Sequence, residues 1–77
     1  MTPEQCRAGR ALLDWLQEEL ARRSGLAVSS LRAFEGGKSR PIRNNMVAIQ
    51  GALEQAGVIL VAEDDVAGPG VRLAKRR

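Results

Sequence analysis

Four basic residues lie close together in the middle of the sequence: Arg32, Lys38, Arg40 and Arg43. The twelve residues that they span contain one acidic residue, Glu35. Guanidinium and ammonium groups gathered in this way bind phosphate groups through charge-assisted hydrogen bonds. The alternative is a charged loop that is only exposed to solvent. The cluster therefore predicts that one side of the molecule is distinctly positive, which is compatible with a nucleic-acid partner.

Residues that carry catalysis or bind metals are scarce. The sequence has no His and no Tyr, and its single Cys6 has no second cysteine for a disulfide or a zinc site. The segment "GPG" (68–70) precedes an expected strand and not a helix, so it is unlike a phosphate-cradling loop. We therefore expect no enzymatic activity, no metal and no cofactor. Cys6 is expected to be a small apolar residue on a helix.

The composition is that of a small globular domain. The chain has 77 residues, of which 44% are hydrophobic and 27% charged, and its net charge is +3. This length predicts a single domain, 1–77, with a small core. No apolar run reaches the roughly 18 residues of a membrane span, and "MTPEQCRAGR" at the N-terminus does not resemble a signal peptide. We therefore expect no membrane association and a cytoplasmic location.

Capping signals and apolar spacing predict four helices in the first 57 residues. A capping box at Thr2 begins the first helix, glycines end the second and third, and Pro41 opens the fourth, which ends at Gly57. The expected ranges are 3 to 14 or 15, 17–24, 28–36 and 41–56. The expected core positions are Cys6, Leu12, Leu13 and Leu16, then Leu20 and Ala21, then Val28, Leu31 and Phe34, and finally Ile42, Met46, Ile49, Leu53 and Ala56.

The pattern changes after residue 57. The run "VILV" (58–61) and the alternating "VRL" (71–73) predict two short strands joined by a polar loop at 64–70. Residues 58–77 are expected to form this strand pair and a basic tail. An open apolar edge strand invites uncontrolled pairing, which favours a specific dimer; in the alternative, the strands only cover the core of their own chain. The candidate dimerisation residues are Val58, Ile59, Leu60, Val61, Val71 and Leu73.

Two short helices separated by a glycine form a bihelical unit between residues 17 and 36. Counted from Gln17, Ala21 is the fifth residue and Gly25 the ninth, and Leu31 follows at a core position. The small residue lets the helices approach, the glycine accepts the positive φ of the turn, and the leucine locks the second helix onto the first. This register is typical of a helix-turn-helix.

Three segments carry a family resemblance: "ALLDWLQEELARRSG" (11–25), "LRAFEGGKSRP" (31–41), and "NNMVAIQGALEQAGV" (44–58) with the ending "GPGVRL" (68–73). With these segments the chain resembles the XRE, or Cro/C1-type, family of bacterial helix-turn-helix regulators. The resemblance implies a mainly α fold: a four-helix, lambda-repressor-like helix-turn-helix domain followed by a short C-terminal β-hairpin. It also implies a cytoplasmic, nucleoid-associated repressor of transcription that places helix 28–36 in the major groove of double-stranded DNA. Because one such unit contacts only a half-site, we expect a homodimer on a palindromic operator.

Carried over by position, the resemblance assigns contact residues. The residues expected to face base edges are Val28, Ser29, Arg32 and Ala33. Those expected to contact phosphates are Gln17, Lys38, Ser39, Arg40, Arg43 and Asn44. The family also pairs an arginine of the first helix with the glutamate that ends the third. Arg10 and Glu35 are the matching residues, so Glu35 is expected to be a structural ion-pair partner and not a catalytic acid.

The base-facing positions carry mostly short side chains. Arg32 is the residue among them that can bond guanine bidentately, although it could instead reach a phosphate or point to solvent. This sparse readout leaves a second hypothesis: a protein-binding helix-turn-helix adaptor or antiactivator that inhibits another regulator through the apolar face of helix 28–36 or through the strands. The aromatic residues Trp15 and Phe34 occupy core spacing and are expected to pack in the core and not to stack on bases.

Overall fold

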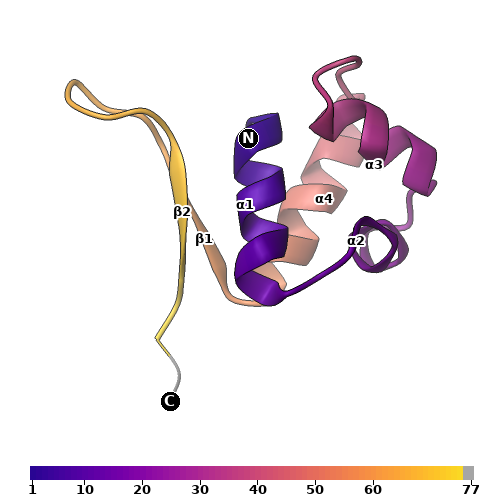
Figure 1. Cartoon of the computed structure of the whole chain (residues 1–77), viewed down its shortest axis with the longest axis horizontal. Coiled ribbons are helices and arrows are strands. Elements are labelled where there is room, and N and C mark those ends of the chain that lie inside the picture. Colours follow the sequence, from indigo (N-terminus) through magenta and orange to yellow (C-terminus); the bar gives the residue numbers. More distant parts are fainter. Residues whose placement is uncertain (76–77) are drawn as a thin grey trace.

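Four helices and a C-terminal strand pair make up the computed structural model, which describes residues 1–75 (Figure 1). The helices are α1 (Pro3–Leu13), α2 (Gln17–Ser24), α3 (Val28–Glu35) and α4 (Arg43–Gln55), and the strands are β1 (Val58–Val61) and β2 (Gly70–Leu73). The expected mainly α fold with a C-terminal hairpin is confirmed. Residues 76 and 77, the end of the expected basic tail, lie outside the described residues. Within residues 1–75, none of the helices has the length and apolar character needed to cross a membrane.

The helix ends follow local chemistry. The Thr2 hydroxyl accepts a hydrogen bond from the Gln5 N–H, and the Gln5 side-chain oxygen accepts one from the Thr2 N–H, which confirms the capping box. α1 stops at Leu13, slightly before its expected end, because Asp14 adopts a left-handed conformation with φ of 58°. Gly25, with φ of 73°, ends α2 as expected. In the part of the chain that the structure describes, the residues preceding the other three helices form no side-chain cap: Leu16, Ala27 and Ile42.

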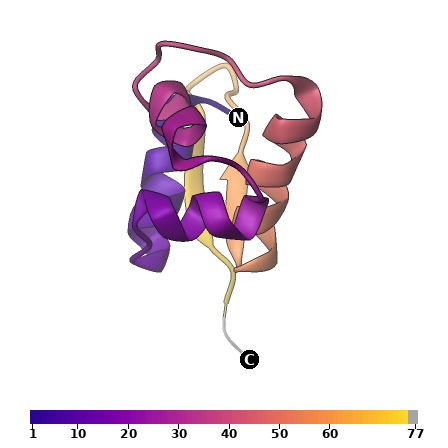
Figure 2. The same ribbon diagram turned by 90° about the vertical axis from the view of Figure 1, so that its right-hand side faces the viewer.

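The hairpin packs on one side of the helical layer (Figure 1). Seen from the right-hand side of that view, the two strands lie behind the helices, with β2 toward α1 and β1 toward α4 (Figure 2). The fully buried apolar side chains come from all four helices and from β1: Cys6, Leu20, Ala21, Leu31, Phe34, Ile49, Leu53 and Val58. One core therefore holds the hairpin and the helices together.

Gly9 is buried where α1 approaches α4 and β1. A β-carbon at this position would lie 3.3 Å from Cδ2 of Leu53 and 3.5 Å from Cγ1 of Val58. The missing side chain thus permits close packing of α1, α4 and β1. This close packing explains why a glycine is found inside α1, although Gly destabilises a helix by about 1 kcal/mol relative to Ala.

Gln5 fastens the hairpin to α1. Its side-chain Nε2 donates hydrogen bonds to Val61 O at 3.1 Å and to Gly70 O at 3.0 Å. Val61 and Gly70 are partners at the loop end of the antiparallel pair, and Val58 is opposite Leu73 at the other end. Gln5 is 6% exposed, so these bonds are largely shielded from water. One side chain thus serves both as part of the helix cap and as the anchor of the strand pair.

Three apolar side chains that helical spacing assigned to the core are exposed. Leu16 and Ile42 are 72% and 69% exposed. Both precede a helix and have extended backbones, with ψ of 162° and 160°, so neither joins the apolar stripe of the helix that follows. Because the backbone at Ile42 is extended, α4 begins at Arg43 and not at Pro41. Leu12 is 42% exposed and lines a shallow depression together with residues of the chain end after β2.

The hairpin has an inner and an outer face, because side chains alternate along a strand. Val58 is 2% exposed and part of the core, so it cannot contribute to a dimer interface as the sequence suggested. Leu60 and Val71 are cross-strand partners that also pack against the core. The expected dimerisation residues that remain substantially exposed are Ile59, Val61 and Leu73.

Candidate nucleic-acid interface

The turn between α2 and α3 sets the orientation of α3. The Leu26 N–H donates to Ala21 O at 2.9 Å and closes the turn after Gly25. Leu31 and Phe34 anchor the inner side of α3 in the core. The opposite side of the helix carries the exposed residues Ser29, Ser30 and Arg32. The helix-turn-helix thus holds α3 on the surface with a polar face toward solvent.

A basic segment, residues 38–44, follows α3 and leads into α4. It crosses the upper end of the molecule between these two helices (Figure 2). The sequence has no acidic residue between Glu35 and Glu54. The side chains of this segment that were expected to contact phosphates are all exposed: Lys38, Ser39, Arg40, Arg43 and Asn44. Their positive charge is therefore not neutralised by acidic residues within the segment.

A shallow groove lies between α3 and the basic segment. Its volume is about 310 Å³, and its polar lining consists of Ser29, Ser30, Ser39 and Asn45. Hydroxyl and amide groups of this kind bond the phosphate and sugar oxygens of DNA. Ser30 and Asn45 were not identified from the sequence. Each of them directly follows a predicted contact residue, Ser29 or Asn44, and this adjacency in the sequence could have identified them.

The N-terminus of α4 adds backbone donors to the basic segment. Ile42 has no side chain that can accept from the first turn, and that turn contains Arg43 and no acidic residue. α2 also lacks a side-chain cap, but its first turn contains Glu18 and Glu19. Negative side chains repel an anion at a helix N-terminus. The acidic side chains that would repel an anion are therefore present at the N-terminus of α2 and absent from that of α4.

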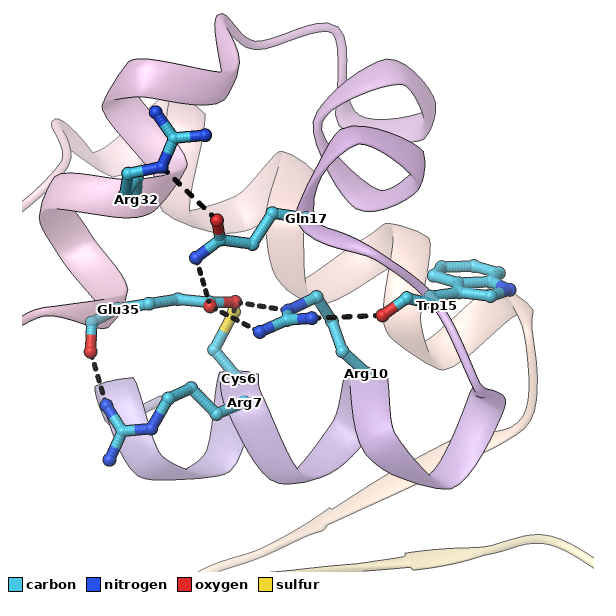
Figure 3. A network of polar contacts seen from close by, with 7 residues as sticks. All are labelled: Cys6, Arg7, Arg10, Trp15, Gln17, Arg32 and Glu35. Carbon is cyan, nitrogen blue, oxygen red and sulfur yellow. Dashed lines mark hydrogen bonds and ion pairs between the residues drawn. The ribbon is translucent and has the colours of Figure 1, made fainter.

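Gln17 begins α2, and its side chain is engaged within the protein (Figure 3). Its Nε2 donates to Glu35 Oε1 at 2.9 Å, and its Oε1 accepts from Arg32 Nε at 3.4 Å. A phosphate at this position would therefore meet chiefly the backbone N–H groups of the first turn. The expected phosphate contact of Gln17 stays a prediction, and it now rests on the backbone more than on the amide.

Glu35 is the buried centre of this network (Figure 3). Arg10 binds its carboxylate bidentately, with Nε at 2.7 Å from Oε2 and Nη2 at 2.7 Å from Oε1, which confirms the expected ion pair. Burial by itself raises the pKa of Glu35, but hydrogen bonds from Arg10, Gln17 and Cys6 outweigh it and hold the pKa below its ordinary value. The carboxylate is therefore charged at neutral pH.

Cys6 is a hydrogen-bond donor as well as a core residue. Its Sγ donates to Glu35 Oε2 at 3.1 Å, and its side chain is fully buried. Burial and then the neighbouring carboxylate raise the pKa of the Cys6 thiol well above its usual range. The expectation of a small apolar residue on a helix is confirmed in part: Cys6 is buried on α1, but its thiol also bonds a charged side chain, which the sequence did not predict.

No protein-family model matches the chain, and no curated protein matches it at significant similarity. In residues 1–75, no group of three or more His, Cys, Asp or Glu side chains is placed to hold a metal ion. Function is therefore inferred from the geometry of α3, the basic segment and the network at Glu35.

The four residues expected to face bases differ in exposure. Ser29 and Arg32 are exposed, whereas Val28 and Ala33 are half-buried, and Val28 packs against the core. Phe34 is buried as expected, while Trp15 is only half-buried. The Arg23 guanidinium lies 4.4 Å from the centre of the Trp15 ring, which leaves that ring less available to a base.

Proposed function

We propose that this chain is a sequence-specific, double-stranded DNA-binding regulator of transcription, of the XRE (Cro/C1-type) kind. The observation that carries the proposal is the position of the exposed, polar face of α3 beside a basic segment free of acidic residues. A helix fits the major groove of B-DNA, and the phosphates that flank the groove require cationic and N–H donors. The proposed site of action is the nucleoid, in the bacterial cytoplasm.

The proposed contacts divide into base readout and phosphate binding. Arg32 and Ser29 face base edges, and the half-buried Val28 and Ala33 offer at most apolar contacts to thymine methyl groups. The phosphate contacts come from the basic segment and the first turn of α4: Lys38, Ser39, Arg40, Arg43 and Asn44. No metal or cofactor takes part in these contacts.

The proposal includes a homodimer. One helix-turn-helix covers only a few base pairs, and two copies on a palindrome, with recognition helices about 34 Å apart, double the recognised site. A protein that occupies such an operator excludes other proteins from it. Together with the resemblance to Cro/C1-type regulators, this favours repression.

The outer face of the hairpin is the proposed surface for the second copy. Ile59 and Val61 are 39% and 40% exposed there, on the side opposite the core. The hairpin also separates charge along its length: the acidic residues Glu63, Asp64 and Asp65 are in the loop, and the basic residues Arg72 and Lys75 are at the other end. Two hairpins related by a two-fold axis and running in opposite directions would place each acidic loop beside the basic end of the other.

The protein-binding alternative has less support at α3. Its apolar residues Val28 and Ala33 are half-buried, and the exposed face carries Ser29, Ser30 and Arg32. A helix that grips another protein would be expected to expose its apolar side chains.

The experiment that tests the proposal is selection of bound fragments from a pool of random duplexes at about 0.05 M salt, where phosphate contacts are strong. The expected result is one enriched palindromic sequence. Affinity for it should fall steeply with salt, with a logarithmic slope of about −0.9 for each phosphate contacted. Arg32→Ala is expected to relax the preference at one base pair of each half-site.

Matched charge variants separate phosphate contacts from a general effect of net charge. Lys38→Ala and Arg40→Ala should weaken binding to every duplex alike and make the salt slope shallower by about 0.9 each. Arg22→Ala removes the same charge in the last turn of α2, outside the proposed DNA contacts and the outer face of the hairpin, and it should change affinity little. A folded wild-type protein that binds no duplex at low salt would refute the proposal.

A further inference from the structure

Three side chains from two helices, α2 and α3, form a continuous chain of hydrogen bonds that ends on the exposed face of α3 (Figure 3). Glu35 Oε1 accepts from Gln17 Nε2 at 2.9 Å, and Gln17 Oε1 accepts from Arg32 Nε at 3.4 Å. Glu35 is 2% exposed, whereas Arg32 is exposed. The chain of bonds thus connects a buried charge to the side chain best suited to read a base.

The carboxylate of Glu35 determines which way the Gln17 amide points. A charged carboxylate only accepts hydrogen bonds, so the amide must turn its NH₂ group toward Glu35. Arg10 keeps the carboxylate in place with two bonds of 2.7 Å from the other side. The amide oxygen of Gln17 then points toward the guanidinium of Arg32, a group that only donates hydrogen bonds.

The contact engages one part of the Arg32 guanidinium and leaves the rest open. Gln17 accepts from Nε, and within residues 1–75 no other hydrogen bond of the Arg32 side chain is found. The two terminal NH₂ groups are therefore available to bond another molecule. They can donate in parallel to O6 and N7 of guanine, which is the commonest specific contact in the major groove.

We propose that Gln17 is a positioning residue that determines specificity: oriented by Glu35, it holds Arg32 in the conformation that reads guanine. This inference rests on the proposed function, because it requires α3 to lie in the major groove. An arginine side chain that is already ordered loses less rotational freedom on binding. Gln17 therefore adds to base preference and not to the general attraction for DNA.

The alternative role of Gln17 is a simple phosphate contact, and the two roles predict different results. A lost phosphate contact weakens binding to all duplexes by the same factor. A lost positioning contact weakens binding to the guanine-containing operator and leaves binding to an operator with a different base at that position almost unchanged. The ratio of the two dissociation constants is therefore the informative quantity.

The test uses the full chain and an operator selected with the wild-type protein. Arg32→Ala first identifies the guanine, as the position at which preference is lost. Gln17→Met then keeps the length of the side chain while removing the NH₂ donor and the carbonyl acceptor of its amide. It is expected to lower the preference for guanine about 3- to 10-fold, the range that corresponds to ordering one long side chain. In the Arg32→Ala background, the same substitution should leave base preference unchanged.

Two further variants guard against loss of folding. Gln55→Met, an equivalent change at an exposed position of α4, should leave both affinity and preference unaltered. Gln17→Asn retains an amide but shortens the side chain by one methylene, so that it cannot span Glu35 and Arg32, and it should show the same loss of preference as Gln17→Met. Urea unfolding of each variant establishes that the protein compared is folded.

The outcomes separate the inference from the proposed function. If the wild-type protein binds no duplex, the proposed function fails, and the inference fails with it. If the wild-type protein selects an operator but both Gln17 variants keep its guanine preference within about 2-fold, the inference alone is overturned. A uniform loss of affinity on all duplexes also overturns it, in favour of a phosphate contact.

Discussion

Glu35 is a charged side chain inside a small core, and its neighbours account for its presence there. Its carboxylate accepts hydrogen bonds from Arg10, Gln17 and Cys6, and its backbone carbonyl accepts one from Arg7. In the described chain, no buried side-chain nitrogen or oxygen lacks a hydrogen-bond partner. A buried ion pair adds little net stability over an apolar pair, but removing one partner is costly, because the other charge is left without compensation.

Glu35→Gln is expected to lower the free energy of unfolding by about 3 kcal/mol at pH 7, the lower end for a broken buried pair, because 17% of the Arg10 side chain remains in contact with water. The pKa of Glu35 is lower in the folded state than in the unfolded state. The charged form of Glu35 therefore contributes fully to the free energy of unfolding above its unfolded-state pKa of about 4.3. This contribution is lost as pH falls through the folded-state pKa.

Urea unfolding between pH 7 and pH 3 measures both effects. The variant should lose less stability on acidification than the wild type. Part of the pH dependence of stability should remain in the variant, because two other carboxyl groups also have lowered pKa values. Arg23 and then Arg22 lower the pKa of Glu19, and backbone N–H groups lower that of Asp64. Equal acid dependence in the two proteins would contradict the role given to Glu35.

Cys6 is expected to be unreactive in the folded protein. Its side chain is fully buried, and its raised pKa leaves almost no thiolate at neutral pH. A chromogenic disulfide reagent should therefore modify it only as fast as the structure opens, with the ordinary rate of a free thiol restored in concentrated urea. Rapid modification in native buffer would show that α1 does not cover this residue.

At the scale of elements, the link between α1 and the hairpin rests on few groups. The two strands have four residues each and form a sheet of their own, which is marginal without support. Val58 and Leu60 supply apolar contact with the helices, and Gln5 supplies two hydrogen bonds at the loop end. The position of the outer face of the hairpin thus depends on a residue near the start of the chain.

Gln5→Glu separates the two roles of this residue. A carboxylate can still accept from the Thr2 N–H, but it cannot donate, and it faces the carbonyl groups of Val61 and Gly70. Amide hydrogen exchange in β1 and β2 is expected to become at least about 10-fold faster, with a smaller change in α4. Thr2→Ala is the control, since it removes only the hydroxyl that caps α1. It should lower the free energy of unfolding by about 1 kcal/mol without speeding exchange in the hairpin more than elsewhere. Unchanged exchange in the strands of Gln5→Glu would contradict the anchoring role.

At the scale of the whole molecule, two surfaces with different character lie apart. The basic segment is at one end of α3 and α4, and the outer face of the hairpin is on the other side of α1 (Figure 1). This separation allows one surface to bind DNA while the other pairs with a second copy. Each surface can therefore be altered without changing the other.

The wild-type chain is expected to dissociate from dimer to monomer on dilution, as measured by sedimentation equilibrium. Val61→Lys should shift the protein to the monomer, because it places a charge on the outer face of the hairpin. Val47→Lys makes the same change on α4, where Val47 is 61% exposed, and should leave the dimer intact. A wild-type chain that remains monomeric up to roughly 0.1 mM would contradict the proposed dimer.

Much of the fold could be predicted because its signals are local. The capping box at Thr2 and Gln5 and the turn at Gly25 depend on residues a few positions apart. The spacing of Leu31 and Phe34 identified the buried side of α3 in the same way. Periodicity failed at Leu16 and Ile42, because the extended backbone before a helix breaks the helical phase.

The sequence by itself determined the four helices, the hairpin, the charge of the basic segment and, through a resemblance, the Arg10 and Glu35 pair. Only the tertiary structure decided that Gln5 holds strands 56 and 65 residues away, and that the Gln17 amide joins residues 18 and 15 positions distant. It also decided that Val58 belongs to the core. The physical reason is that a side-chain amide has the same chemistry at any position, whereas its partners depend on which distant segments pack beside it.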